Sequence, residues 1–157
     1  MLPSPAQLDA LIALLALVAL LLVAALSDLR RRRIGNRLCL TIALLALPYW
    51  LVAEPTHPFR LLIQIGLALG VCLVLFLPFV ANLLGGGDVK LMAALALWLP
   101  PEALINALLV VSIAGGVLGL IMLFFARRWT EKSVPYGVAI AIAGVLAVAP
   151  RMVELLR

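Results

Sequence analysis

Long apolar runs separated by short polar clusters make up almost the whole chain. The runs consist mainly of Leu, Ala and Val and lack the alternation of apolar and polar positions that barrel strands show. They therefore predict helices, and most approach the 17–25 residues that a helix needs to span a bilayer. The predicted segments are residues 8–27, 38–53, 61–80, 89–99, 103–126 and 135–149.

The apolar content indicates that lipid is the solvent for most of this chain. Hydrophobic residues make up 66% of its 157 positions, whereas soluble domains have about 45–50%. We therefore expect an all-α, polytopic membrane bundle of about six transmembrane helices, with residues 1–157 forming a single domain. The fourth segment is too short to cross a bilayer at about 1.5 Å per residue. The first has no basic residue before it, so we expect a retained helix rather than a signal peptide.

Basic residues predict the orientation of the helices. Nine of the twelve Lys and Arg residues follow the first segment, precede the fourth or follow the fifth. The positive-inside rule makes that side cytoplasmic and, with six spans, puts both termini in the periplasm. The net charge of +5 then reflects anchoring to anionic lipid, and we expect no nucleic-acid partner.

Two aspartates flank the apolar segments on this predicted cytoplasmic side. Asp28 follows the first segment and precedes four arginines, and Asp88 follows the triplet Gly85–Gly87. A charged side chain at the bilayer centre costs about 2.5–3.5 kcal/mol on insertion scales, so such residues often mark functional sites. Two carboxylates on one face predict a paired acid/base site.

The two aspartates and the glycine triplet could also have purely structural roles. Asp28 as a boundary residue would pair with an arginine, an interaction of small energy. Asp88 as an N-cap would begin a helix at Val89. The glycines permit a bend or a close approach of backbone. Because the fourth segment is short, we expect residues 85–88 below the membrane surface, at the mouth of a water-filled cavity.

We expect neither a metal nor a cofactor. Cys39 and Cys72 are far apart in apolar runs, and the single histidine, His57, lies in a predicted periplasmic loop. No cluster has the ligand spacing of a zinc site, and no CxxC pair occurs.

Three segments of the chain resemble the type IV prepilin peptidases, which are intramembrane aspartyl proteases with a GxGD motif. Gly85-Gly86-Gly87-Asp88 followed by Val-Lys-Leu is similar to that motif, with Gly85 or Gly86 as the early glycine. Asp28 with its basic stretch, Ile34 and Asn36 resembles the first catalytic motif of the family, and Val-Pro-Tyr136-Gly137 resembles its third recurrent segment.

Two departures refine this resemblance. Gly35 stands where the family usually has proline, and the loop after the first helix lacks the CxxC-bearing insert of members that also methylate their product. The chain thus resembles the short, peptidase-only branch that serves Flp-type, or tight-adherence, pili. The implied function is removal of a prepilin leader, after its terminal glycine, at the cytoplasmic face of the bacterial inner membrane. The implied partners are the prepilin and lipid.

The resemblance implies that Asp28 and Asp88 share a proton and hydrolyse the bond by general acid/base catalysis. Lys90 then either holds Asp88 ionised or anchors the interface. Ser27 and Asn36 either bind the Asp28 carboxylate or cap helices, and Tyr136 either contacts substrate or belongs to the interfacial belt.

Two other classes of protein fit the same sequence. A small transporter would use a helix broken at residues 85–88 as an ion site. A non-enzymatic membrane assembly subunit of a secretion or pilus system would tolerate the loss of either aspartate.

The charge pattern gives a direct test of orientation. In a variant without Cys39 and Cys72, we expect single cysteines at Arg31 and Arg128 to resist an impermeant thiol reagent added outside intact cells, because both positions lie in predicted cytoplasmic loops. Both should react once the membrane is opened. Labelling of either cysteine in intact cells would contradict the predicted orientation.

Overall fold

The computed structural model describes residues 4–53, 59–125 and 136–157, which form six α-helices and, within those ranges, no strand. Each of the six predicted segments corresponds to one of these helices, so the expected helical bundle is confirmed; residues 126 and 135 of the predicted segments lie outside the described ranges. The helices are α1 (Pro5–Arg31), α2 (Asn36–Ala53), α3 (Phe59–Val80), α4 (Gly86–Ala96), α5 (Pro101–Phe125) and α6 (Tyr136–Leu155).

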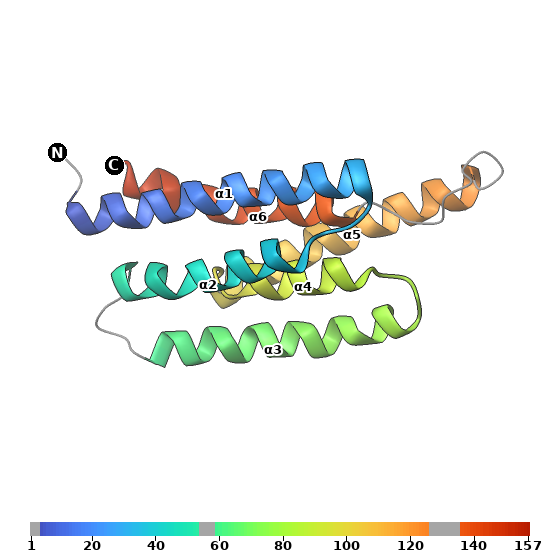
Figure 1. Ribbon diagram of the computed structural model, residues 1–157, viewed down its shortest axis with the longest axis horizontal. Coiled ribbons are helices and arrows are strands. Elements are labelled where there is room, and N and C mark those ends of the chain that lie inside the picture. The colour runs from blue at the N-terminus through green and yellow to red at the C-terminus, as the bar shows by residue number, and fades with distance from the viewer. Residues whose placement is uncertain (1–3, 54–58, 126–135) are drawn as a thin grey trace.

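The six helices run along a common long direction, with α1 and α3 on opposite sides and α2 and α4 between them (Figure 1). α1 packs against α6 and α2, α4 lies against α2, α3 and α6, and α5 packs on α6. α1 begins and α6 ends at one end of the bundle, which we call the terminus end. α4 and α6 begin at the opposite end, which we call the aspartate end.

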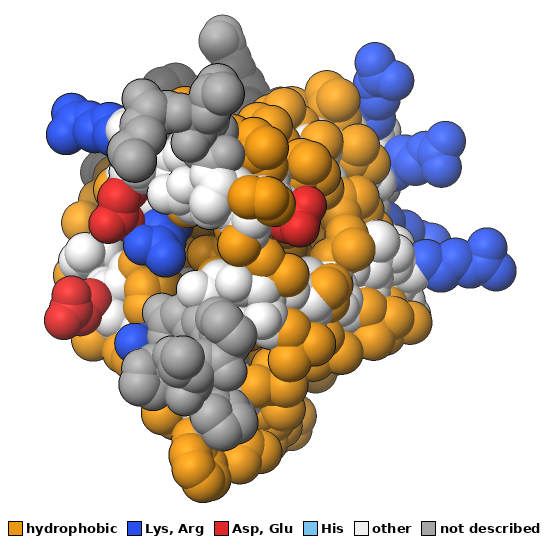
Figure 2. Space-filling view, turned by 90° about the vertical axis from the view of Figure 1, so that its left-hand side faces the viewer, with side chains coloured by type: hydrophobic (Ala, Val, Ile, Leu, Met, Phe, Trp, Pro, Cys, Tyr) orange, Lys and Arg blue, Asp and Glu red, His pale blue; other side chains and the backbone are white. Residues whose placement is uncertain are grey.

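Apolar side chains cover the outside of the bundle, as expected for a protein surrounded by lipid. α1, α2, α3 and α6 are each long and apolar enough to cross a membrane. α3 is the clearest case, because only Gln64 and Val71 of its side chains are buried. Hydrophobic side chains also occupy much of the surface seen from the terminus end (Figure 2).

The helix ends differ from the sequence-based segments where caps, rather than apolar residues, set the boundary. α1 begins at Pro5 because Ser4 and Gln7 form a capping box, in which Ser4 N–H donates to Gln7 Oε1 at 2.7 Å. At its other end α1 continues past the apolar run to Arg31. Asp28 therefore lies inside the helix, one turn from its end.

Close packing of α1, α4 and α6 depends on a glycine. A Cβ atom at Gly144 of α6 would lie 2.8 Å from Leu21 Cδ1 of α1 and 3.1 Å from the methyl groups of Leu95 of α4. Small residues at such positions let membrane helices approach closely. The buried residues of α1 recur every three or four positions and end at the aspartate: Ala10, Leu14, Leu17, Leu21, Ala24 and Asp28.

Polar side chains from α2 and α3 satisfy the carbonyl end of the short helix α4. With its amide nitrogen turned toward α4, the fully buried Gln64 donates to the carbonyl oxygens of Leu99 at 2.9 Å and Ala96 at 3.2 Å. Trp50 Nε1 donates to the Leu97 carbonyl at 2.6 Å. The last carbonyls of a helix lack partners within it, and lipid offers none. α4 can therefore end inside the bundle.

We expect Gln64→Leu to destabilise the protein by about 1–3 kcal/mol, the usual cost of leaving buried polar groups without partners. Thermal unfolding in detergent, followed by circular dichroism, measures this change. Ile63→Ala is the matched control, because Ile63 is the next residue of α3 and is 51% exposed on the lipid-facing surface. Equal melting temperatures for Gln64→Leu and the wild type would contradict this account of how α4 ends.

Candidate active site

Asp28 is a buried carboxylate that meets the beginning of α6. Its side chain is 6% exposed and accepts a hydrogen bond from the Gly137 N–H at 2.8 Å. The Val138 N–H also faces this carboxylate, and the positive charge of Arg32 attracts it. The first N–H groups of a helix have no partner within it and favour a negative charge. Asp28 of α1 therefore supplies the partner that the first turn of α6 needs.

Asp88 does not begin α4, so its expected role as N-cap is wrong. The N-cap is Gly85, and Asp88 is the third residue of the helix. Its carboxylate reaches back to the Gly85 backbone N–H, as an acidic residue at this position does in a capping box. The side chain is 8% exposed. Asp88 thus also lies at a helix N-terminus.

The two carboxylates lie at the same end of the bundle and interact electrostatically. Ile34, in the short connection between α1 and α2, lies between the helix starts that hold them. A Cβ at Gly87 would lie 3.2 Å from Ile34 Cβ, and one at Gly137 would lie 2.8 Å from Ile34 Cδ1. One apolar side chain therefore packs against the beginnings of both α4 and α6.

The glycine triplet allows close contacts with the rest of the protein. A Cβ at Gly86 would lie 3.2 Å from Phe79 Cε2, and one at Gly85 would lie 2.8 Å from Asp88 Oδ2. Gly86 and Gly87 are helical, and no described glycine has a positive φ. The irregular backbone expected over residues 85–88 therefore stops at Gly85.

The other candidate residues are divided between the site and its surroundings. Lys90 Nζ donates to Asn36 Oδ1 at 3.0 Å, which links the start of α2 to α4. Ser27 Oγ donates to the Arg33 carbonyl at 2.8 Å, so it holds the arginine loop rather than the Asp28 carboxylate. Tyr136 packs against Gly115 of α5 and lines a cavity of about 250 Å³ there.

Sequence reasoning missed the contribution of Gly137. This residue was noted only as part of a recurrent segment, although its N–H donates directly to Asp28. A Cβ on Gly137 would lie 2.7 Å from Asp28 Oδ2. The available signal was a glycine at the expected start of a helix, but the partner lies 109 positions away in the sequence.

Chemically, the site offers two buried carboxylates that interact electrostatically. Among the described residues, no three His, Cys, Asp or Glu side chains gather as metal ligands would. Buried carboxylates that interact with one another are suited to paired general acid and base chemistry. The fold and the site thus define a membrane-embedded helical protein with an aspartate pair at one end.

Comparison with known proteins identifies the family. The model of the type IV leader peptidase family matches residues 15–120, a range that includes both Asp28 and Asp88. The chain therefore belongs to the type IV leader peptidase family. No solved structure matches it.

Curated relatives are similar over a limited segment. Proteins named prepilin leader peptidase/N-methyltransferase are 39% identical over 64 residues in Aeromonas salmonicida, 39% over 61 residues in Burkholderia pseudomallei and 41% over 61 residues in Xanthomonas campestris pv. campestris. These matches cover 41%, 39% and 39% of this chain, but only 22%, 20% and 21% of the relatives. The matched part is thus about a fifth of each relative.

Under the function proposed below, we expect Gly137→Ala to lower prepilin processing by at least about tenfold, because the new methyl group would displace the Asp28 carboxylate and small misplacements of catalytic groups are costly. Processing of a co-expressed prepilin, read as the shift in its size, measures the effect. Gly116→Ala is the control, since a Cβ there would meet nothing within 4 Å. Equal processing by both variants would show that the position of Asp28 does not matter.

Proposed function

We propose that this protein removes the leader peptide of type IV prepilins, with Asp28 and Asp88 as its catalytic pair. The observation that carries the proposal is the burial of two interacting carboxylates at one end of a lipid-exposed bundle. Membership of a leader peptidase family supports the reaction class. Buried acids in a membrane protein are costly, which favours a functional role.

In the proposed reaction, one carboxylate takes a proton from a water molecule while the water oxygen attacks the scissile carbonyl carbon. The other carboxyl group is protonated and donates to the carbonyl oxygen, which balances the charge that develops there. The first carboxyl group then gives its proton to the leaving amine as the carbon–nitrogen bond breaks, and the second regains its proton from the hydroxyl group of the intermediate. Each aspartate faces backbone N–H groups at the start of a helix, so either carboxylate can act as the base.

The proposed substrate is a Flp-like prepilin, cut at the cytoplasmic face of the inner membrane. The basic residues near the aspartates support this orientation through the positive-inside rule, with the terminus end in the periplasm. The connection from Arg31 to Asn36 is short, which supports the peptidase-only branch. In this scheme Gly85, Gly86, Gly87, Lys90, Asn36 and Tyr136 support the aspartates or contact substrate.

We expect Asp28→Asn and Asp88→Asn each to lower prepilin processing by more than about 10²-fold while the protein still inserts and accumulates. Asn keeps the size of Asp and much of its ability to accept hydrogen bonds at a helix start. It cannot serve as a general base or a carboxylic acid. The double variant should be scarcely worse than either single one, because the residues act as a unit.

Asp9→Asn is the matched control for this experiment. Asp9 also lies in α1, but it is exposed near the terminus end and far along the chain from the site. We expect this variant to process prepilin normally. Near wild-type processing by Asp28→Asn or Asp88→Asn would contradict the two-aspartate mechanism and favour a non-enzymatic assembly subunit.

A further inference from the structure

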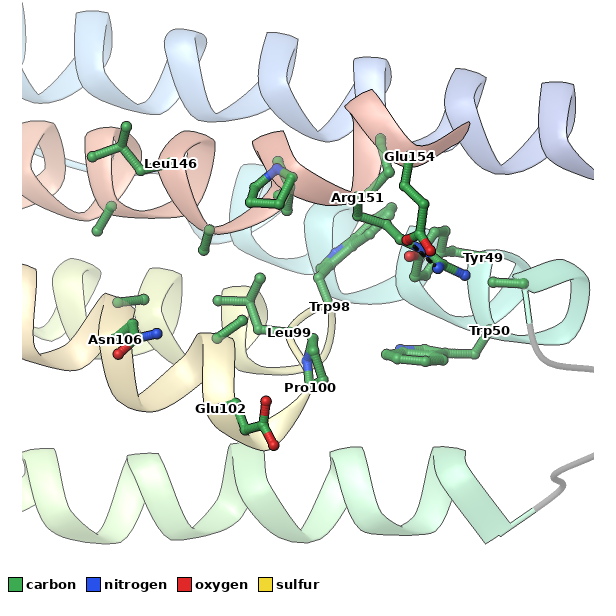
Figure 3. A pocket seen from close by; sticks show the side chains of 18 of the residues that line it. Tyr49, Trp50, Trp98, Leu99, Pro100, Glu102, Asn106, Leu146, Arg151 and Glu154 are labelled. Atoms are coloured by element: carbon green, nitrogen blue, oxygen red, sulfur yellow. Dashed lines mark hydrogen bonds and ion pairs between the residues drawn. The ribbon is translucent and has the colours of Figure 1, made fainter. Parts of the chain in front are cut away.

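A second polar site lies at the terminus end of the bundle, away from the aspartates. It is a cavity of about 740 Å³ between α2, α3, α5 and α6, and it is open to the surroundings. Figure 3 shows Glu102 on α5, Tyr49 on α2 and the pair Arg151 and Glu154 on α6 around it. The volume is within the range of about 300–1,000 Å³ that is usual for ligand sites.

The cavity exists because α4 and α5 do not reach the terminus end. α4 stops at Ala96, and α5 starts at Pro101. Gln64, which bonds to the turn between these helices, is five positions into α3. At 1.5 Å per residue the turn therefore lies roughly 8 Å below the start of α3. Glu102 and Asn106, just beyond the turn, line the cavity at this depth or below it.

Charges of both signs line the cavity in equal numbers among the described residues. Arg60 and Arg151 are balanced by Glu102 and Glu154. Arg151 and Glu154 form an ion pair with a distance of 2.7 Å, and Tyr49 also interacts with Arg151. Figure 2 shows acidic and basic side chains close together at this end.

Glu102 and Asn106 distinguish the cavity from a packed interior. Both are exposed, and neither has a hydrogen-bond or ion-pair partner within the described parts of the chain. They lie one turn apart on the face of α5 that borders the cavity, whereas Ile105 and Leu109 are exposed apolar residues of α5 that do not line it. An ionisable group at membrane depth requires a polar environment. The lining of the cavity therefore suits a polar occupant.

We propose that the cavity binds the headgroup of a zwitterionic phospholipid with a primary amine, the phosphoethanolamine type. Its phosphate would face Arg151 and Arg60, since arginine binds phosphate oxygens well. Its ammonium would face the carboxylate of Glu102 and the amide oxygen of Asn106. Leu146 and Val110 border the same cavity and offer apolar contacts for the acyl chains. Trp50 and Tyr49 are of the residue types that gather at headgroup level.

The balance of charges selects this lipid over two common alternatives. An anionic headgroup would satisfy the arginines but leave Glu102 facing negative charge. A choline headgroup carries no N–H donor and cannot hydrogen-bond Glu102 or Asn106. The inference does not depend on the peptidase activity, because the cavity and the aspartate pair lie at opposite ends.

Native mass spectrometry of the purified protein, equilibrated in turn with phosphatidylethanolamine, phosphatidylglycerol and phosphatidylcholine, tests this proposal. We expect phosphatidylethanolamine to be retained about tenfold more than either other lipid, as one or two charge-assisted hydrogen bonds would give. Soluble phosphoethanolamine is the fourth probe. Equal affinity for it would replace the lipid by a small soluble ligand and overturn the proposal.

Variants of Glu102 and Arg151 test which residue binds the ammonium of the headgroup and which binds its phosphate. Glu102→Gln should abolish the preference over phosphatidylcholine, and Arg151→Gln should weaken retention of all three lipids. Glu102 has no described partner to lose, so its variant should fold even if Arg151→Gln does not. Asp9→Asn and Arg157→Gln are the controls, because both residues are exposed near the terminus end without lining the cavity.

Two results would overturn the proposal. Retention of no lipid by the folded wild-type protein would mean that the cavity holds water. Unchanged lipid preference in folded Glu102→Gln would mean that the retained lipid binds elsewhere on the bundle.

Discussion

The helix ends that lie within this bundle must find their hydrogen-bond partners inside the protein, because lipid provides none. At three helix ends, side chains from elsewhere in the protein or from the same helix supply these hydrogen bonds. Asp28 accepts from the first turn of α6, and Asp88 reaches back to the start of α4. Gln64 and Trp50 donate to the carbonyls where α4 finishes. The position of α4, on which both the aspartate pair and the opposite cavity depend, is held at each end in this way.

Packing in the middle of the bundle determines what meets at its ends. Gly144 lets α6 approach Leu21 of α1 and Leu95 of α4. Asp28 lies seven positions beyond Leu21, and Asp88 seven before Leu95, so both share the buried faces of their helices. Two acids occupy positions that would otherwise suit apolar residues. Helix geometry alone then brings them to the same end.

The sequence was sufficient to predict the helices and to place Asp28 and Asp88 at one end of the bundle, since apolar run length and isolated charges are local signals. It failed where the partner is distant. Asp88 looked like a cap because glycines precede it, yet the N-cap is Gly85, three residues earlier. Gln64 was not singled out in the sequence, although it is fully buried against the end of α4. Nothing near Gln64 in the sequence indicates a helix end more than thirty positions away.

The same hydrogen bonds bear on how the proposed hydrolysis would start. Asp28 and Asp88 are 6% and 8% exposed, while a peptide bond and a water molecule must reach both. Ile34 packs against the helix starts that hold the two acids, and it belongs to a short connection rather than to a helix. A shift of this connection would leave the bond from the Gly137 N–H to Asp28 in place, because neither partner belongs to the connection. In the proposed reaction, both carboxylates would thus keep their hydrogen bonds to the helix starts while Ile34 made room for substrate and water.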